Sequence, residues 1–221
     1  DPDHVTYVWF DALLNYITVP GYVADPARFR TLWPADVQFI GKDILRHHAV
    51  YWPIMLHALG LPDEQMPQTI IAHGWWKIGE QKMSKSLGNI VDPAVVVGHL
   101  LKDQPYAADV YRYFLLREIS FGQDGNFSED AILTRLQTEL GNDLGNLVNR
   151  ALSMLERYSD GTIPAEHAPG CAVDDEPLRQ AACALPGAVE AAMGRLAFST
   201  ALEAIMRVVG QANRYIETQA P

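Results

Sequence analysis

Two lysines and two hydroxyl side chains lie together in one short polar segment. The segment reads Lys82-Met83-Ser84-Lys85-Ser86, and Gly79 and Gly88 stand on either side of it. Ammonium groups and hydroxyl donors on a loop can hold a triphosphate whose charge shifts during a reaction. Two lysines alone would fit a solvated basic loop equally well, but this five-residue string also follows a strand-like run and His73-Gly74. The sequence therefore predicts a loop suited to a triphosphate.

The first third of the chain alternates segments that favour strands with segments that favour helices. Strand-like apolar runs cover residues 5–10, 37–40 and 68–72, and helical character is found over 11–17 and 44–59. This alternation predicts an α/β fold with a parallel sheet. Ligands of such sheets bind beyond the carboxyl ends of the strands. We therefore expect the chemistry at residues 9–16, 41–48 and from His73 onward.

After residue 90 the pattern becomes helical. Helices are expected over residues 91–101, 107–119, 177–193 and from near Thr200 to 218, with a Gly-rich connector at 121–126 and a loop at 159–175. Between them, leucines at three- and four-residue spacing over 133–155 predict one long amphipathic helix. Pro177 suits a first helical position, and Thr200 with Glu203 fits a capping box. The second half is therefore predicted to be an all-α bundle.

Composition excludes several functional classes. The 221 residues carry a formal net charge of −10, which argues against non-specific nucleic-acid binding by the whole surface but leaves room for a local basic patch. The longest apolar run is shorter than a membrane span. The two cysteines, Cys171 and Cys183, lack zinc spacing and make a poor disulfide framework. We expect no protein-bound zinc or other metal site, and a protein of the reducing cytoplasm whose thiols are buried or incidental.

Several strings resemble one family. The lysine segment matches the nucleotide-binding loop of class I aminoacyl-tRNA synthetases. Five further strings resemble the methionyl-tRNA synthetases in particular: residues 8–16 (VWFDALLNY), 39–48 (FIGKDILRHH), 72–76 (AHGWW), 142–150 (NDLGNLVNR) and 212–221 (ANRYIETQAP). The resemblance implies that residues 1–125 are the C-terminal half of a Rossmann-like catalytic domain with its stem-contact region. Residues 126–221 would then be most of a helical anticodon-binding domain.

The resemblance also implies a binding site for the methionine side chain. The residues that it places there are Trp9, Ala12, Leu13, Tyr16, Ile44 and His48. A thioether is apolar and polarisable, favours aromatic neighbours and accepts only weak hydrogen bonds, so this residue set suits it. Taken alone, His48 would be interpreted as a satisfied core histidine. Its place one turn after Ile44 favours the binding role.

For ATP, which would arrive with Mg²⁺ as a substrate, the resemblance implies a second set of residues. These are Gly41, Asp43, His73, Trp76, Lys82, Met83, Ser84, Lys85 and Ser86, with Lys82 and Lys85 in the catalytic role. Glycine permits close approach of the backbone, and a carboxylate can accept from ribose hydroxyls near a helix N-terminus. An N-capping role for Asp43 is compatible with that function. A structural role for the rings of Trp75 and Trp76 is an equal alternative.

The implied reaction joins L-methionine to ATP as methionyl-adenylate and then transfers the methionyl group to tRNA(Met). Asn146 and Arg150, four residues apart on one helical face, are the positions that the resemblance assigns to the anticodon. Two alternatives stay open: another class I synthetase (leucyl, isoleucyl, valyl or cysteinyl), and a non-catalytic tRNA-binding or assembly module. The family's His-Ile-Gly-His-type segment and inserted domain are not in this sequence, so the N-terminal half of the same enzyme is an expected partner.

Overall fold

The computed structural model describes residues 3, 5, 7–84, 87–120, 122–163 and 176–219. Within it, the chain divides into two compact units, residues 1–75 and residues 76–221. Each unit has its own hydrophobic core.

The first unit contains a parallel pair of strands. Strand β1 (Val37–Gly41) pairs with β2 (Thr69–His73), and the register runs from Val37 opposite Thr69 to Gly41 opposite His73. The chain between the two strands forms the short helices η1 (Lys42–Ile44), η2 (His47–Tyr51), α3 (Trp52–Ala58) and η3 (Asp63–Gln65). The predicted parallel sheet and the predicted helix after the first of these strands are confirmed.

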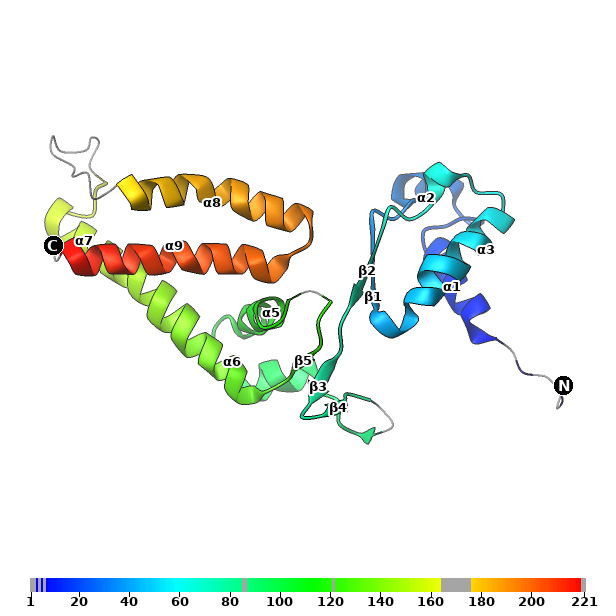
Figure 1. The fold of residues 1–221 in the computed structure, drawn as a ribbon, viewed down its shortest axis with the longest axis horizontal. Coiled ribbons are helices and arrows are strands. Elements are labelled where there is room, and N and C mark those ends of the chain that lie inside the picture. Colours follow the sequence, from blue (N-terminus) through cyan, green and yellow to red (C-terminus); the bar gives the residue numbers. More distant parts are fainter. Residues whose placement is uncertain are drawn as a thin grey trace. The chain divides into compact units, whose positions relative to one another are not determined.

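The core of this unit lies between helices. Helix α1 (Val8–Thr18) lies beside α3 (Figure 1), and Leu13 and Ile17 of α1 belong to one buried cluster with Trp52 and Leu56 of α3. Helix α2 (Pro26–Leu32) adds Phe29 to the cluster, and Asp25 caps this helix by accepting from the backbone N–H of Arg28.

The strand predicted over residues 5–10 is wrong. Residues 8–10 are the first turn of α1, and Val5 is 99% exposed. The reason is periodicity: Trp9, Leu13 and Ile17 recur every four residues, which puts them on one helical face toward α3. The aromatic and β-branched content of the run was a weaker signal than this spacing.

In the second unit a small sheet carries the first part of the lysine loop. Strand β3 (Trp76–Ile78) pairs antiparallel with β4 (Gln81–Lys82) and parallel with β5 (Gly125–Asn126). The predicted connector at 121–126 thus ends in a strand. Gly125 is required there, because an added Cβ would lie 2.3 Å from Cγ2 of Ile119. Strands of two or three residues are too short to show a period of two, so the sequence did not reveal them.

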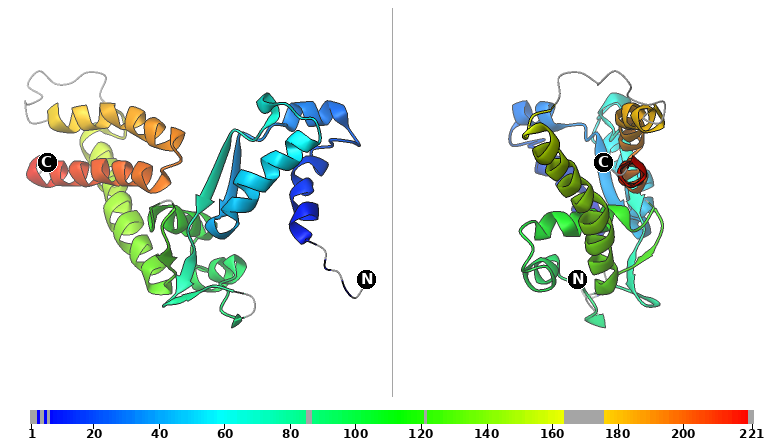
Figure 2. Two further views of the ribbon diagram at one scale, coloured as in Figure 1. Left: turned by 45° about the vertical axis from the view of Figure 1, so that its right-hand side comes forward. Right: turned by 90° about the vertical axis from the view of Figure 1, so that its left-hand side faces the viewer.

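Helices make up most of this unit. After α4 (Pro93–Val95) and η5 (Val96–Leu100) come α5 (Ala107–Arg117), α6 (Glu129–Arg135), the π-helical η6 (Leu136–Gly145), α7 (Asn146–Ser159), α8 (Glu176–Gly194) and α9 (Phe198–Gln219). Elements α6, η6 and α7 follow one another without a break as one long helix (Figure 2). The predicted helical second half is confirmed.

One core joins the β3 region to these helices. Val96, Val110, Phe114 and Ile132 are buried together, and Trp76 packs against them. The boundary between the two compact units therefore falls between residues 75 and 76 of the chain, whereas the sequence predicted a domain boundary at residue 125. The functional boundary stays a prediction, since the family's catalytic domain need not end where the packing changes.

Helices α8 and α9 form an antiparallel pair, visible in Figure 1 and Figure 2. Helix α8 begins at Glu176, so Pro177 is its second residue. Helix α9 begins at Phe198, which puts Thr200 inside the first turn, so the capping box predicted at Thr200 is wrong. Cys183 on α8 is a free, exposed thiol, so it is not buried, and Cys171 and most of the loop predicted at 159–175 lie outside the described residues.

Candidate functional site

Two residues predicted to bind methionine, Trp9 and Tyr16, contact the imidazole of a third, His48. Trp9 and Tyr16 stand two turns apart on α1, and both rings are edge-on to His48, with centroids 6.0 and 5.5 Å from that of the imidazole. The His48 side chain is buried, and Trp52 lies 5.9 Å from Tyr16 on the core side. The helical form of residues 8–10, which the sequence did not predict, is what turns Trp9 toward this cluster.

Hydrogen bonds fix the orientation of the His48 ring. Its Nδ1 lies 3.0 Å from the carbonyl oxygen of Ile44, and its Nε2 lies 2.9 Å from the hydroxyl of Tyr16. A carbonyl only accepts, so Nδ1 carries the hydrogen, and in the neutral ring Nε2 accepts from the Tyr16 hydroxyl. Burial raises the pKa of Tyr16 above its ordinary value, which keeps that proton on the phenol. The cluster thus offers a ligand aromatic surface with few unsatisfied donors.

An apolar hollow of about 220 Å³ adjoins Trp9. Its lining is entirely apolar or aromatic: Tyr7, Trp9, Phe10, Leu13, Tyr51, Ile54 and Met55. Leu13 is therefore both a core residue and a wall of this hollow, while Ala12 is exposed on α1. Tyr16, Ile44 and His48 are not among the lining residues.

Sequence reasoning missed a second aromatic layer. The ring of His47 stacks on Trp9 at 4.3 Å, and its Nε2 lies 3.0 Å from the hydroxyl of Tyr7. Tyr51 meets His47 edge-on at 5.6 Å. The spacing of His47, Tyr51 and Met55, each four residues apart, was the signal that could have revealed this layer.

The carboxyl ends of the two parallel strands bring together three of the predicted nucleotide residues. Gly41 and His73 are directly opposite each other in the sheet. Asp43 follows at the start of η1, and its Oδ1 would lie 2.7 Å from a Cβ added to Gly41. The indole N–H of Trp75 donates to Asp43 at 3.4 Å, while the Nζ of Lys42 lies 4.4 Å above the Trp75 ring.

This edge of the sheet is the usual ligand position of an open α/β sheet. Trp75 and Lys42 are contacts that the predicted set omitted. The indole N–H of Trp75 is one of the contacts of the exposed Asp43 carboxylate.

The lysine loop starts on strand β4. Lys82 is exposed, and its backbone lies opposite that of Lys77 in the β3–β4 pairing. The Nζ of Lys77 lies 3.5 Å from the carboxylate of Asp124. Asn89 closes the loop: its Oδ1 accepts from the N–H of Ser84 at 2.8 Å, and its Nδ2 donates to the carbonyl of Lys82 at 3.2 Å.

Lys85 and Ser86 lie outside the described residues. The loop belongs to the second unit and the aromatic cluster to the first, so the predicted closeness of the two stays a prediction.

Trp76 has a structural contact that bears on its predicted role. Its ring lies 5.4 Å from Phe114 and 6.5 Å from Phe127, within the core of the second unit. Its carbonyl accepts from the N–H of Met83 at 3.3 Å, which ties the lysine loop back to β3.

The two predicted anticodon residues stand on successive turns of α7. Asn146 is exposed, and the guanidinium of Arg150 lies 3.7 Å from Glu217 on α9. With side chains 38% and 67% exposed, this ion pair is weak. The Arg150 guanidinium can therefore leave the Glu217 carboxylate at little cost in stability.

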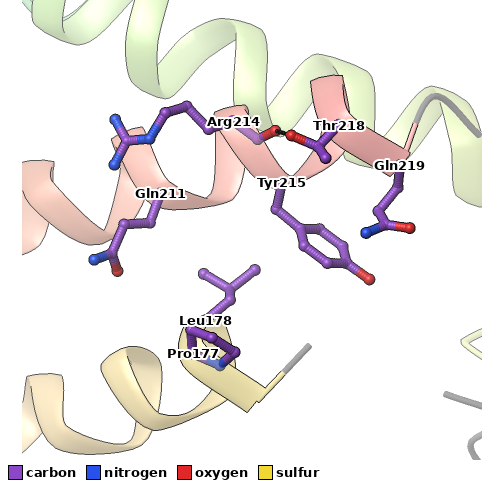
Figure 3. Close-up of a pocket in the computed structure, with 7 residues that line it drawn as sticks. All are labelled: Pro177, Leu178, Gln211, Arg214, Tyr215, Thr218 and Gln219. Atoms are coloured by element: carbon purple, nitrogen blue, oxygen red, sulfur yellow. Dashed lines mark hydrogen bonds between the residues drawn. The ribbon is translucent and has the colours of Figure 1, made fainter. Parts of the chain in front are cut away.

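A groove of about 580 Å³ lies nearby, between α8 and the C-terminal half of α9. Figure 3 shows Gln211 and Tyr215 directed from α9 toward α8, from which Leu178 points back at them. Arg214 also lines this groove.

No described cluster of His, Cys, Asp and Glu side chains has an arrangement that could hold a metal ion. Among the helices of the described residues, none has the length and apolar character needed to cross a membrane.

A parallel strand pair in the first unit and a largely helical second unit are the elements that the sequence predicted for a class I synthetase. The family model described as tRNA synthetases class I (M) matches residues 1–152. The chain belongs to this family of class I tRNA synthetases.

Individual relatives of the chain support the same family assignment. The chain is 47% identical to a "Methionine--tRNA ligase" of Caldanaerobacter subterraneus over 223 residues, covering 100% of the chain and 33% of the relative. It is 45% identical to the ligase of that name in Rhizobium meliloti, of which it covers 41%. The crystal structure of Mycobacterium tuberculosis methionyl-tRNA synthetase bound by methionyl-adenylate matches with a TM-score of 0.82 and 46% identity, over 100% of this chain and 41% of that one. The chain thus spans about a third of the length of the first curated relatives.

Proposed function

We propose that the protein to which this chain belongs is a methionyl-tRNA synthetase. It would activate L-methionine with ATP and then transfer the methionyl group to tRNA(Met) in the cytoplasm. The observation that carries the proposal is the aromatic cluster of Trp9, Tyr16 and His48, in which both imidazole nitrogens are already satisfied. Such a surface suits a thioether, which gains from aromatic contact and needs no strong donor. Ala12, Leu13 and Ile44 complete the proposed methionine set.

ATP would bind at the carboxyl ends of β1 and β2. Asp43 would accept from the ribose hydroxyls, and the backbone at Gly41 would allow the nucleotide to approach closely. His73 and Trp76 would flank the adenine, Trp76 through its backbone because its ring is packed in the core. The loop from Lys82 to Ser86 would hold the triphosphate with its Mg²⁺.

The first reaction step requires little proton chemistry from the protein. The methionine carboxylate is already a nucleophile, and it attacks the α-phosphorus of ATP as pyrophosphate departs. Catalysis then consists of positioning and charge neutralisation, which Lys82 and Lys85 would supply. The loop closure by Asn89 supports this role, because it holds the backbone of Lys82 and Ser84 in one conformation.

An exchange assay tests the proposal as a whole. The complete protein is expected to exchange pyrophosphate into ATP with methionine, and to do so at least about 100-fold less efficiently with leucine, isoleucine, valine or cysteine. Preference for one of those four would assign another class I specificity. A protein that binds tRNA and catalyses no exchange with any amino acid would be a binding module, contrary to the proposal.

The helical unit would recognise the anticodon through Asn146 and Arg150. Arg150→Ala and Asn146→Ala in the complete enzyme are each expected to raise the KM for tRNA about 10–100-fold, because a lost amide or guanidinium contact to a base costs about 1–3 kcal/mol. Pyrophosphate exchange, which needs no tRNA, should be unchanged. Steady-state aminoacylation with wild-type tRNA(Met) measures the effect.

Arg157→Ala is the matched control, because Arg157 is an exposed arginine on the same helix. Equal KM values for the Arg150 and Arg157 variants would refute the anticodon assignment.

The N-terminal half of the same enzyme is the proposed partner of the first unit. Around the apolar hollow, Tyr7, Phe10 and Ile54 are 58%, 64% and 62% exposed. Contiguous large apolar side chains this exposed are typical of a surface that another part of a protein covers. The curated relatives have the additional length that such a covering part requires.

A further inference from the structure

A network of charged side chains joins α5 to the long helix of the second unit. The carboxylate of Glu139 on η6 accepts from the hydroxyl of Tyr113, from Arg117 at 3.1 Å and from Arg135 at 2.5 Å. Arg135 also donates to Glu118 at 2.9 Å. Glu139 is thus the one carboxylate of this network that contacts three donors.

The network is partly buried and electrically balanced. Its four charged side chains, two arginines and two glutamates, are between 13% and 27% exposed. Partial burial reduces solvent screening, so these contacts are stronger than those of an exposed ion pair. Burial, with the hydrogen bond and charge of Glu139 next in importance, raises the pKa of Tyr113, and its phenol remains a proton donor at neutral pH.

Beyond α6, partly buried leucines and polar contacts hold the long helix. Leu136 and Leu140 of η6 pack against the core of the second unit, although no side chain of η6 or α7 is fully buried. Besides the Glu139 contacts, the polar links described for this stretch are Asn213 of α9, which donates to the carbonyl of Asp143 at 2.9 Å, and the weak pair of Arg150 with Glu217. These polar contacts act together with the packing of Leu136 and Leu140 to set the direction of this helix.

The two sides of the network lead to different parts of the proposed enzyme. On α5, Phe114 lies next to Tyr113 and packs on Trp76 of β3, the strand that pairs with Lys82. On the long helix, Asn146 follows Glu139 by seven residues. Glu139, between the core-packed Leu136 and Leu140, is thus a polar point at which the helix with the proposed anticodon residues is attached to the core that contacts β3.

We propose that Glu139 is a positioning residue for tRNA recognition: it fixes the direction of the anticodon helix relative to α5 and thereby sets Asn146 and Arg150 for the RNA. This inference rests on the proposed function of α7. The carboxylate accepts from three donors and carries a negative charge. A glutamine in its place would be uncharged, and its NH2 group would face at least one of the donors Tyr113, Arg117 and Arg135.

The test uses Glu139→Gln in the complete enzyme. We expect the KM for tRNA to rise about tenfold, with pyrophosphate exchange and the KM values for methionine and ATP within about twofold of wild type. Tyr113→Phe removes one contact without changing charge and should give a smaller rise of the same kind. Glu156→Gln is the control, because it removes the charge of an exposed glutamate on the same long helix.

Three results would overturn the positioning role. The first is a tRNA KM for Glu139→Gln equal to that of Glu156→Gln. The second is a parallel fall of exchange and aminoacylation, which indicates a general loss of structure. The third is an unchanged tRNA KM for Tyr113→Phe. Asn146→Ala, measured alongside, separates the two proposals: if it raises the tRNA KM and Glu139→Gln does not, only the positioning role fails, whereas no effect of Asn146→Ala refutes the anticodon function itself.

Discussion

Replacing Lys85 by alanine in the complete enzyme is expected to slow methionyl-adenylate formation about 10²–10³-fold, the usual cost of removing one donor that stabilises charge in a transition state. The affinity for methionine should barely change, because the amino acid is proposed to bind at the aromatic cluster of the first unit. Pyrophosphate exchange measures the rate, and tryptophan fluorescence during methionine titration measures the affinity.

Two further lysine variants serve as controls for the exchange rate of Lys85→Ala. Lys82→Ala removes the lysine at the fixed end of the loop, where Asn89 holds the backbone, and should also impair exchange. Lys102→Ala, at an exposed lysine of the same unit, should leave the rate unchanged. An exchange rate for Lys85→Ala close to that of the wild-type enzyme would remove the lysine loop from the proposed chemistry.

The second large effect is expected at Trp9. Its ring is stacked on His47 and edge-on to His48, and removing an aromatic anchor from a binding site costs about 2–4 kcal/mol of binding free energy. Trp9→Ala should therefore raise the KM for methionine about 30–1000-fold, while the KM for ATP changes little. Steady-state exchange at varied methionine and at varied ATP separates the two constants.

Stability must be measured with the same variant, since Trp9 also packs against the core. Thermal unfolding shows whether the protein remains folded at the assay temperature. Asp11→Ala on the same helix is the control, because that side chain is exposed. If Trp9→Ala is folded and has an ordinary KM for methionine, the methionine site lies elsewhere.

The nearness of Gly41 and His73 could be predicted because its signals are local. The turn at residues 41–43 and His73 both follow apolar runs, and parallel pairing then brings Gly41 opposite His73. The lysine loop was identified from its five-residue string and from the family resemblance, and its role stays a prediction. In these cases residue type and position along the chain determine where the side chain lies.

Other features depend on tertiary contacts that the sequence does not display. The stack of Trp9 on His47 joins residues 38 positions apart, and two of the three partners of Glu139, Tyr113 and Arg117, come from another helix. The strand predicted over residues 5–10 failed because the four-residue spacing of Trp9, Leu13 and Ile17, which is stabilised by packing against α3, outweighs local propensity. The packing of Trp76 with Phe114 likewise places the lysine loop in the helical unit.

Because α6, η6 and α7 follow one another without a break, the number of residues between Leu136 and Gly145 sets the direction in which Asn146 and Arg150 point. One residue accounts for about 100° of rotation in an α-helix, so a single deletion or insertion turns everything beyond it by an angle of that order. Asn146 and Arg150 would then face away from their present direction, although the sequence would remain fully helical. Homologous chains that keep this recognition surface should accept substitutions in the segment far more readily than changes in its length.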